Sequence, residues 1–434
     1  MEKAINFKEL DEAFLHRWDS APTREIADAM QALYQLYDPE ALVRFFASLW
    51  DGESGGFYYS HSARDHEGFA PDIESTYQIL NIVRNMGAAD GVGRELPDLL
   101  GRRMTDGIIS FVQGMQSEED GYFYHPQWRD SSGLLRVHRD QTSAIKILEW
   151  LGAEPKYATA ISRADSADGA KTLPRHITDG DAAEAYVRES LGAHYTEGWS
   201  NKLGSQAEMW ISSGCIDRVL DVLDEIQDPE SGMWVVHKNE NGTYLARNGK
   251  TESAYGVLTA SYKVAAIYNK AGRAIKHPLA IVKNAIEGVR STIVPATIPY
   301  LFNPWATLNY LRSNIKRHSP ELIGEYDALI AEGGADMIYG VAEKLRAFRK
   351  PDASYSYYPD RSHPLIYGTR SSLGIYEGDV NGTLLGIKSV TDAAAAAFAL
   401  GGSVPLFCYK HGELFSELCA ENKKISKRPC PEKE

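Results

Sequence analysis

Acidic side chains recur along the chain in settings that could support acid–base chemistry. Glu74 and Glu252 each stand directly before a serine, and Asp140 begins an Asp-Gln-Thr run. Two carboxylates facing one cavity can act as proton donor and proton acceptor when burial and like charge keep one of them protonated. The candidate catalytic carboxylates are therefore Asp72, Glu74, Asp140, Glu252 and Asp379.

The same carboxylates also have a structural explanation. A carboxylate at the start of a helix accepts hydrogen bonds from free backbone N–H groups and interacts favourably with the helix dipole. The sequence leaves both interpretations open, and it indicates that some of the five carboxylates cap helices while at least one of them does chemistry.

The stretch of residues 57–76, FYYSHSARDHEGFAPDIEST, carries more ionisable groups than a simple connector needs. It adds Asp65 and His66 to the candidate catalytic residues, and Tyr58, Tyr59 and Arg64 to the candidate binding residues. A long polar loop between an aromatic segment and a helix is a natural place for a substrate clamp. A solvated surface loop is the alternative.

Later segments supply further candidate binding residues. Aromatic rings can stack on a ligand, while arginine and histidine can contact its polar groups. For the tryptophans, packing against neighbouring helices is the alternative explanation. The residues are Tyr124, Trp128, His138, Arg139, Trp234, Arg370 and Tyr376.

A weak internal repeat indicates the elements that position these residues. Glycine followed by aromatic or large apolar residues occurs in GGFYY, GYFY and GMW, which begin at Gly55, Gly121 and Gly232. Counting from Gly56, Gly121 and Gly232, an acidic or amide residue before a hydroxyl residue follows after 18, 20 and 20 positions, at Glu74, Gln141 and Glu252. A degraded fourth copy runs from 355–358 to 378–381.

Each copy fits a unit of helix, aromatic loop and helix. Glycine provides a turn with positive φ, the rings form a short extended segment, and the Asp/Ser/Thr cluster caps an inner helix. Helical patterns cover about 41–50, 104–115, 216–226, 277–289, 304–315, 320–348 and 389–400, with a worn unit at 196–213. We predict an all-α (α/α)6 barrel, or toroid, of helical hairpins with short aromatic strands in the loops.

Composition excludes some classes of protein. The 434 residues carry a formal net charge of −13, which argues against nucleic acid as a partner. No apolar run of about 18 residues predicts a membrane span, and the first residues do not resemble a secretion signal, so we expect a cytoplasmic location. Cys215, Cys408, Cys419 and Cys430 match no metal-ligand spacing and are expected to be reduced.

The sequence predicts neither a cofactor nor a metal site. His61, Asp65 and His66 could approach a metal, but their spacing fits no standard signature. No low-complexity linker interrupts the helical patterns, which favours one domain over residues 1–420. The charged segment 421–434, with two prolines, is expected to form a flexible tail.

The segments GGFYYS…PDIESTYQIL and QDPESGMW resemble the repeats of α/α-toroid proteins. That group includes (α/α)6 glycosidases, polysaccharide lyases, terpenoid cyclases and prenyltransferase β subunits. The resemblance extends over most of the chain as architecture, and its short motifs specify the fold more closely than the chemistry.

Three functions follow as expectations. The first is cleavage of glycosidic bonds in small oligosaccharides, with hydrolysis by paired carboxylates preferred over elimination. In elimination, His66 or His138 and Tyr58, Tyr59 or Tyr124 would exchange protons while Arg64 or Arg139 neutralised a substrate carboxylate. The second is a terpenoid-cyclase-like enzyme, although DxDD and DDxxD motifs are absent. The third is a toroid that binds glycans or peptides without catalysis. The oligomeric state is not indicated.

Overall fold

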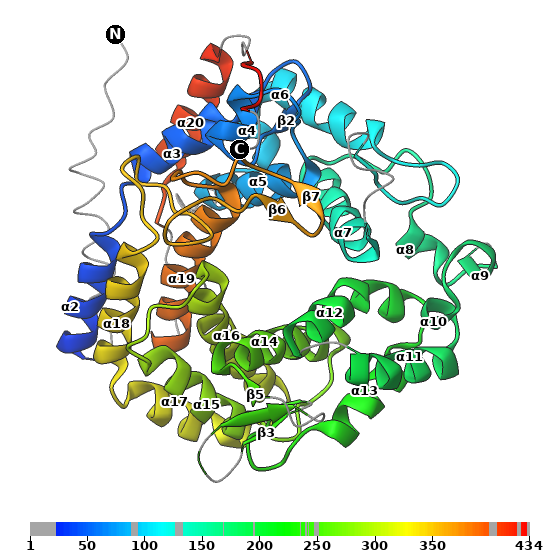
Figure 1. The fold of residues 1–434 in the computed structure, drawn as a ribbon, viewed down its shortest axis with the longest axis vertical. Coiled ribbons are helices and arrows are strands. Elements are labelled where there is room, and N and C mark those ends of the chain that lie inside the picture. Colours follow the sequence, from blue (N-terminus) through cyan, green and yellow to red (C-terminus); the bar gives the residue numbers. More distant parts are fainter. Residues whose placement is uncertain are drawn as a thin grey trace.

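The computed structural model describes residues 23–87, 94–125, 133–167, 169–193, 196–234, 236–238, 241, 243–246, 251–398, 406–422 and 427–431. Helices make up most of these residues and are arranged as two concentric rings around a central opening (Figure 1). The all-α toroid expected from the sequence is the observed fold.

Six described helices form the inner ring. Each contacts the next, and the last contacts the first, so the ring is closed (Figure 1). In ring order they are α5 (Ile73–Gly87), α7 (Leu134–Trp150), α12 (Thr196–Ser212), α14 (Ala254–Ala271), α16 (Ile298–His318) and α19 (Val380–Phe398).

An outer helix precedes each inner helix along the chain. These are α3 (Pro39–Ser48), α6 (Leu96–Gly114), α11 (Gly180–Ala193), α13 (Ile216–Ile226), α15 (Pro278–Arg290) and α18 (Gly334–Arg346). At the two ends of the described chain, α2 (Arg24–Tyr34) packs on α18, and α20 (Tyr409–Glu421) packs on α3, α5 and α6. Short helices fill the connections: α4 (His61–Asp65), α8 (Ala160–Arg163), α9 (Gly169–Thr172), α10 (Arg175–Thr178), η3 (Pro320–Leu322) and α17 (Ile323–Ala331).

The strands are short, antiparallel and confined to connections. β1 (Trp50–Asp51) pairs with β2 (Gly56–Phe57). β4 (Tyr244–Ala246) lies between β3 (Val236–Lys238) and β5 (Thr251–Glu252), with Tyr244 opposite both Lys238 and Glu252. β6 (Leu365–Ile366) and β7 (Thr369–Arg370) form a tight hairpin that lies over the opening of the ring (Figure 1).

The repeated turn has the geometry expected from the sequence, with one correction. Positive φ occurs at Gly55, Gly121 and Gly232, with values of 83°, 76° and 71°. In the first copy the glycine with positive φ is therefore Gly55, whereas Gly56 begins β2. Two residues after each turn a ring pairs back across the turn, in the pairs Phe57 with Trp50, Phe123 with Gln116 and Trp234 with Gln227.

The degraded fourth copy has the same geometry with alanine in place of glycine. Ala353 has a φ of 66°, and Tyr355, two residues later, pairs back to Arg349. An L-residue in this conformation is strained, so the surrounding contacts must hold it there. Tyr355 is fully buried, which provides such contacts.

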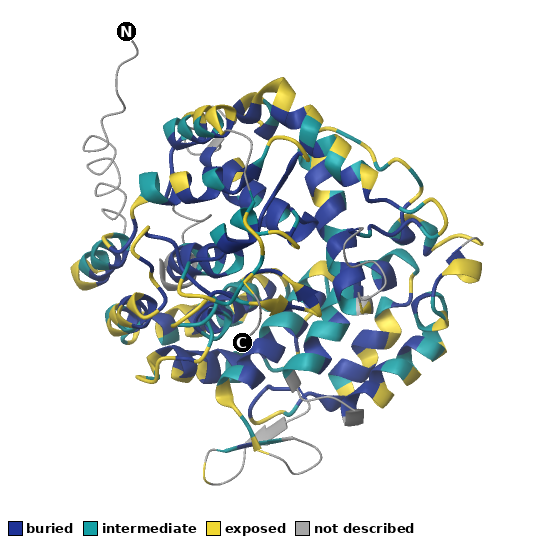
Figure 2. Ribbon diagram, turned by 45° about the horizontal axis from the view of Figure 1, so that its top comes forward, coloured by how far each residue is buried: buried dark blue, intermediate teal, exposed yellow. Residues whose placement is uncertain are grey.

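Apolar side chains fill the space between the two rings. In α13 the buried residues are Val219, Leu220, Val222, Leu223 and Ile226, which form one face of the helix. Burying each such side chain stabilises the fold by about 1.5–3 kcal/mol. Figure 2 shows buried positions along the facing sides of the helices and exposed positions on the outer surface.

Three predicted helix boundaries differ from the structure. α7 begins at Leu134, ahead of Asp140, and α16 begins at Ile298 and contains Pro304. The pattern at 320–348 is divided at Gly333, which has a φ of 74°. Tertiary packing decides such boundaries, because the ring needs inner helices long enough to contact both neighbours.

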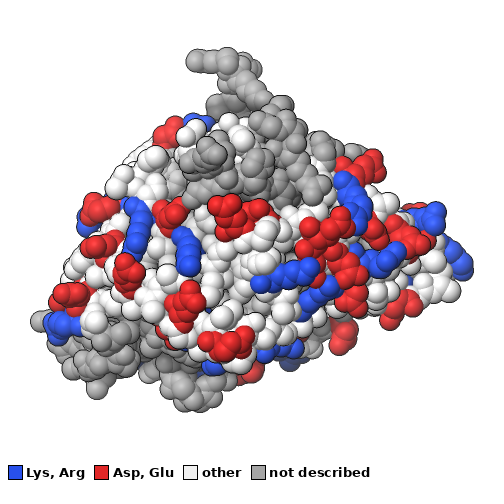
Figure 3. Space-filling view, turned by 90° about the horizontal axis from the view of Figure 1, so that it is seen from below, with Lys and Arg blue, Asp and Glu red and all other residues white. Residues whose placement is uncertain are grey.

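On the outer surface, acidic and basic side chains are interspersed. Figure 3 shows both signs of charge mixed on one face of the molecule. Arg188 pairs with Glu184 and Glu225, which ties α11 to α13. Among the described residues, no helix is both long and apolar enough to span a bilayer.

The expectation of a single domain with a flexible tail after residue 420 stays a prediction. Within that tail, residues 427–431 contact the α4 region. Arg428 exchanges backbone hydrogen bonds with Asp65 and Glu67, and Lys427 donates to the Phe69 carbonyl. This part of the chain therefore covers the outer side of α4.

Gly121→Ala is expected to destabilise the protein by roughly 1–3 kcal/mol, because a residue with a Cβ is strained at this φ. A Cβ there would also lie 2.3 Å from the Ala158 carbonyl oxygen. Gly340→Ala in α18 is the control, because no atom lies within 4 Å of its added Cβ, and helix propensity favours alanine. Urea unfolding measures both variants. Equal stability of Gly121→Ala and wild type would contradict the account of the turn.

Candidate functional site

A cavity of about 260 Å³ lies at the centre of the ring, and all six inner helices contribute to its wall. The second residue of four of these helices faces it: Glu74 of α5, Glu197 of α12, Pro299 of α16 and Asn381 of α19. The beginnings of these inner helices therefore meet at one end of the ring, as expected from the sequence.

The wall combines carboxylates, cations, amides and rings. Besides the four helix-start residues, it contains Tyr77, Gln78, Asn81, Arg139, Ser143, Asn201, Thr259, Tyr262, Lys263, Phe302, Asn303, Tyr357, Tyr367, Leu384, Leu385 and Lys388. Polar groups beside aromatic faces suit a ligand that carries many hydroxyl groups on an apolar ring.

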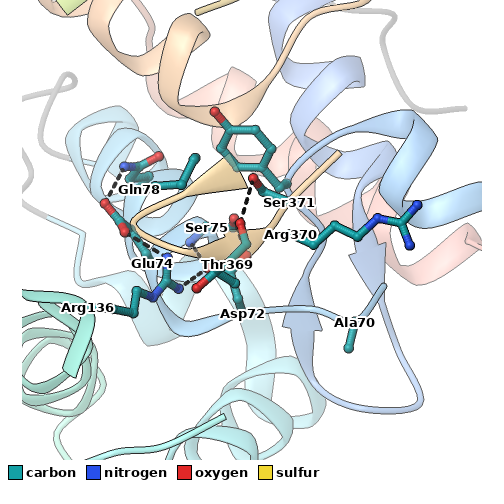
Figure 4. Close-up of a pocket in the computed structure, with 11 residues that line it drawn as sticks. Ala70, Asp72, Glu74, Ser75, Gln78, Arg136, Thr369, Arg370 and Ser371 are labelled. Carbon is teal, nitrogen blue, oxygen red and sulfur yellow. Dashed lines mark hydrogen bonds and ion pairs between the residues drawn. The ribbon is translucent and has the colours of Figure 1, made fainter. Parts of the chain in front are cut away.

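Beside this cavity, one buried guanidinium binds three carboxylates. Arg136 of α7 donates to Asp72 at 3.2 Å and to Glu74 at 3.2 Å (Figure 4). It also donates to Asp140 at 3.0 Å. The side chain of Arg136 is 3% exposed. Arg139, one helical turn further along α7, is a second ion-pair partner of Glu74. The network joins α5 to α7 across the inner ring.

Asp72 serves this network and also caps α5. Its carboxylate accepts hydrogen bonds from the backbone N–H of Ser75 at 2.8 Å and the Ser75 hydroxyl at 2.6 Å. The β6–β7 hairpin covers Asp72 and leaves a pocket of about 10 Å³, which is room for one water molecule (Figure 4). A substrate therefore has no access to Asp72.

Glu74 and Asp140 differ in charge state despite sharing Arg136. Burial raises the pKa of Glu74, but the guanidiniums of Arg139 and Arg136 outweigh burial and lower it. Burial raises the pKa of Asp140 to about 7; Arg136 opposes this shift, whereas the negative charges of Glu74 and Asp72 add to it. Three carboxylates face two arginines, so a proton on Asp140 makes the cluster neutral.

Asp140 belongs to this network but does not line the central cavity. Its carboxyl is 2% exposed, and its Oδ1 atom has no hydrogen-bond partner among the described residues. It is the seventh residue of α7, so the prediction that it lies at the helix start is wrong. The reason is that the apolar Leu134 and Leu135 extend the helix N-terminally.

Glu197 is the second carboxylate of the cavity, and the sequence argument missed it. The Tyr300 hydroxyl donates to Glu197 Oε2 at 2.7 Å. Burial raises the pKa of Glu197; Tyr300 and Lys263 oppose the shift, and Glu252 adds to it. A usable signal existed, because Glu197 follows Thr196 at the start of an inner helix, in the same helical position as Glu74.

Asp379 and Glu252 stand before inner helices but do not line the central cavity. Asp379 is fully buried and caps α19 by accepting the Gly382 N–H at 2.6 Å. The Tyr59 hydroxyl also donates to it at 2.8 Å, so Tyr59 belongs to this capping structure. Burial raises the pKa of Asp379 to about 6, against four hydrogen bonds that lower it. Glu252 lies in β5, and Ser253 caps α14.

The ionisable loop around α4 points away from the cavity. Arg64 pairs with Asp65 at 2.6 Å and donates to the Ser48 carbonyl at 3.0 Å. His66 lies 2.9 Å from the Ser62 carbonyl. Tyr58 packs beneath Lys427, whose amine lies 4.6 Å from the ring centroid. In these contacts the four predicted site residues engage neighbouring parts of the chain, and none of the four lines the central cavity.

The remaining predicted binding residues are dispersed. Trp234 is 1% exposed and packs on Tyr268, and His138 is 2% exposed, with burial and His176 lowering its pKa to about 4. The Tyr124 hydroxyl donates to Asp120 at 2.9 Å.

Two more predicted binding residues, in and after the β6–β7 hairpin, lie outside the cavity. Arg370 points away from the carboxylates and lies over Phe69 (Figure 4). Tyr376 is 63% exposed. Trp128 falls outside the described residues. Of the predicted site residues, Glu74 and Arg139 line the central cavity.

A comparison with solved structures found a weak similarity. No family model matches the chain, and no curated protein matches it. The matching structure is an inactive variant of the α-1,6-mannanase GH76A of Salegentibacter sp. HEL1_6 in complex with α-1,6-mannotriose. The sequences are 12% identical, the match covers 86% of this chain and 98% of that chain, and the TM-score is 0.34. A likeness at this level carries no weight for the function of this chain.

The described residues hold no group of three or more His, Cys, Asp or Glu side chains placed to bind a metal ion. All four cysteines are free thiols. The chemistry available at the cavity is therefore argued from its carboxylates, cations and hydroxyl groups.

The raised pKa of Asp140 predicts a pH-dependent stability. In the unfolded chain this carboxyl ionises near its ordinary value of 3.8, whereas the folded protein keeps it protonated up to about pH 7. Folding therefore loses stability as the pH rises through this interval. Asp140→Asn removes the titration, so its unfolding free energy relative to wild type should increase by up to a few kcal/mol between pH 4 and 7. Urea unfolding across this range measures the difference. A difference that stays constant would contradict the assignment.

Proposed function

We propose that this protein hydrolyses glycosidic bonds of oligosaccharides bound in the central cavity, with Glu197 as general acid and Glu74 as its ionised partner. One observation carries the proposal. Two carboxylates at equivalent positions of different inner helices face one cavity, and their surroundings shift their pKa values in opposite directions. Hydrolysis of a glycosidic bond needs such a division between a protonated and an ionised carboxyl group.

Each residue has a defined part in the reaction. Protonated Glu197 donates its proton to the oxygen of the departing sugar, which makes that oxygen a better leaving group. Glu74 stays ionised between Arg136 and Arg139 and acts either on a water molecule or directly on the anomeric carbon. The departing proton and the attacking group then lie on separate walls of the cavity, α12 and α5.

The Tyr300 hydroxyl is a positioning group for Glu197. Tyr300 stacks face to face on Tyr255, with ring centroids 5.7 Å apart, so its direction is fixed. The rings of Tyr77, Tyr262 and Phe302 offer apolar faces to the sugar, and Asn201 and Asn303 offer hydrogen bonds to its hydroxyl groups.

An oligosaccharide panel tests the reaction class. New reducing ends should appear with at least one oligosaccharide, without the ultraviolet absorbance of an unsaturated uronide. Absorbance that rises together with the reducing ends would replace hydrolysis by elimination. Binding of the oligosaccharides without any cleavage would assign the ring to glycan binding.

Glu197→Gln is expected to lower turnover about 100- to 10,000-fold, because the amide cannot donate a proton to the leaving oxygen. The thermal unfolding midpoint should change little, since Glu197 has no ion pair within 4 Å among the described residues. Glu189→Gln is the control, because it makes the same change at an exposed residue of the outer helix α11, outside the cavity wall. Turnover close to wild type in Glu197→Gln would remove Glu197 from the mechanism.

Tyr300→Phe is expected to move the alkaline limb of the pH–rate profile to higher pH. The Tyr300 hydroxyl lowers the pKa of Glu197, so its removal raises that pKa and keeps the acid protonated longer. Tyr255→Phe keeps the stacked ring and removes a hydroxyl that bonds the Ile293 carbonyl instead, so its profile should match wild type. Identical profiles for all three proteins would contradict the role of Glu197.

A further inference from the structure

A second hollow, of about 220 Å³, lies between α7, α12 and α14. It shares wall residues with the central cavity, including Tyr77, Arg139, Asn201 and Lys263. The two spaces are therefore neighbours, and Arg139 and Lys263 belong to the walls of both.

The charged side chains in the wall of the second hollow are all cations. Arg139, Lys263 and Lys270 line it, and its described wall contains no aspartate or glutamate. Lys270 is neutralised by Glu208 at 2.6 Å. Lys263 differs, because among the described residues no carboxylate lies within 4 Å of its amine. The amine lies 4.6 Å from the centroid of the Tyr262 ring.

Arg139 has donor capacity left over. One of its terminal nitrogens binds Glu74, and its guanidinium lies 4.6 Å from the centroid of Tyr367. Its Nε atom is buried and has no hydrogen-bond partner among the described residues. A buried donor without a partner is costly, so an acceptor at this place would stabilise the site.

Lys263 also lies in an unfavourable electrostatic environment. Burial and the charge of Arg139 lower its pKa to about 7, although Glu74 and Glu197 act in the opposite direction. An anion beside Lys263 would offset both unfavourable effects. Neutral polar groups line the same wall: the hydroxyls of Thr142, Ser143 and Ser205 and the amide of Asn201.

We infer that the second hollow binds an acidic substituent of the sugar chain, a carboxylate or a sulfate, through Lys263 and Arg139, so that the protein acts on acidic oligosaccharides. The inference rests on the proposed function, because it names the substrate class for the same cavity. Lys263 and Arg139 come from different inner helices, so they can approach an acidic group from two sides.

The binding test uses three probes: D-glucuronate, D-glucose 6-sulfate and D-glucose. Calorimetry or NMR titration at low salt should give at least about tenfold tighter binding of one acidic sugar than of glucose. Comparing the two acidic sugars tells a carboxylate from a sulfate. Equal affinities for all three sugars in the wild-type protein would overturn the inference.

Lys263→Met should abolish the preference for the acidic sugar over glucose. Lys283→Met makes the same change of charge on the outer helix α15, where Lys283 faces Glu325, and should keep the preference. Thermal unfolding checks that both variants fold. A preference that survives in Lys263→Met would overturn the inference.

Failure of this inference and failure of the proposed function give different results. Cleavage of neutral oligosaccharides without any preference for acidic sugars would keep the hydrolase and remove the acidic substrate. Selective binding of glucuronate without cleavage of any oligosaccharide would keep the anion site and remove the hydrolase.

Discussion

The site depends on one buried guanidinium that holds three carboxylates together. Without Arg136, Asp72, Glu74 and Asp140 would lie beside one another in a place that water barely reaches, and removing one partner of a buried ion pair typically costs about 3–5 kcal/mol. The same guanidinium links α5 to α7 and, together with Arg139, lowers the pKa of Glu74.

Equivalent positions in the ring acquire different chemistry from their neighbours. Glu74 and Glu197 are both the second residue of an inner helix, and both face the cavity. Glu74 forms ion pairs with two arginines. Glu197 is largely buried and accepts a hydrogen bond from a tyrosine hydroxyl. Two equivalent helix positions can therefore carry carboxyl groups whose pKa values are shifted in opposite directions, because the neighbouring groups decide the shift.

Local signals in the sequence predicted the fold well and the site only in part. The glycine and ring turns, and α13 with its bounds, depend on neighbouring residues and could be predicted. Glu74 and Arg139 could also be found, because each lies 18 residues after a glycine of the repeat, Gly56 or Gly121. The pairing of Glu197 with Tyr300 joins residues 103 positions apart, on α12 and α16, and no local pattern encodes it. The polar residues around α4 do not line the cavity, and part of their contacts come from 427–430, at the far end of the chain, which no local pattern encodes.

The aromatic residues show why a ring in a loop is a poor indicator of a ligand in this fold. Phe57, Phe123 and Trp234 each follow a turn that folds the chain back, so their rings are drawn into the space between the two layers of helices. Rings that reach the cavity come mostly from inner-helix faces, as with Tyr77 and Tyr262. A helix that is packed on both sides holds such a ring more firmly than a loop does. The inner helices therefore supply Tyr77, Tyr262 and Phe302 to the cavity wall, and the connections supply Tyr357 and Tyr367.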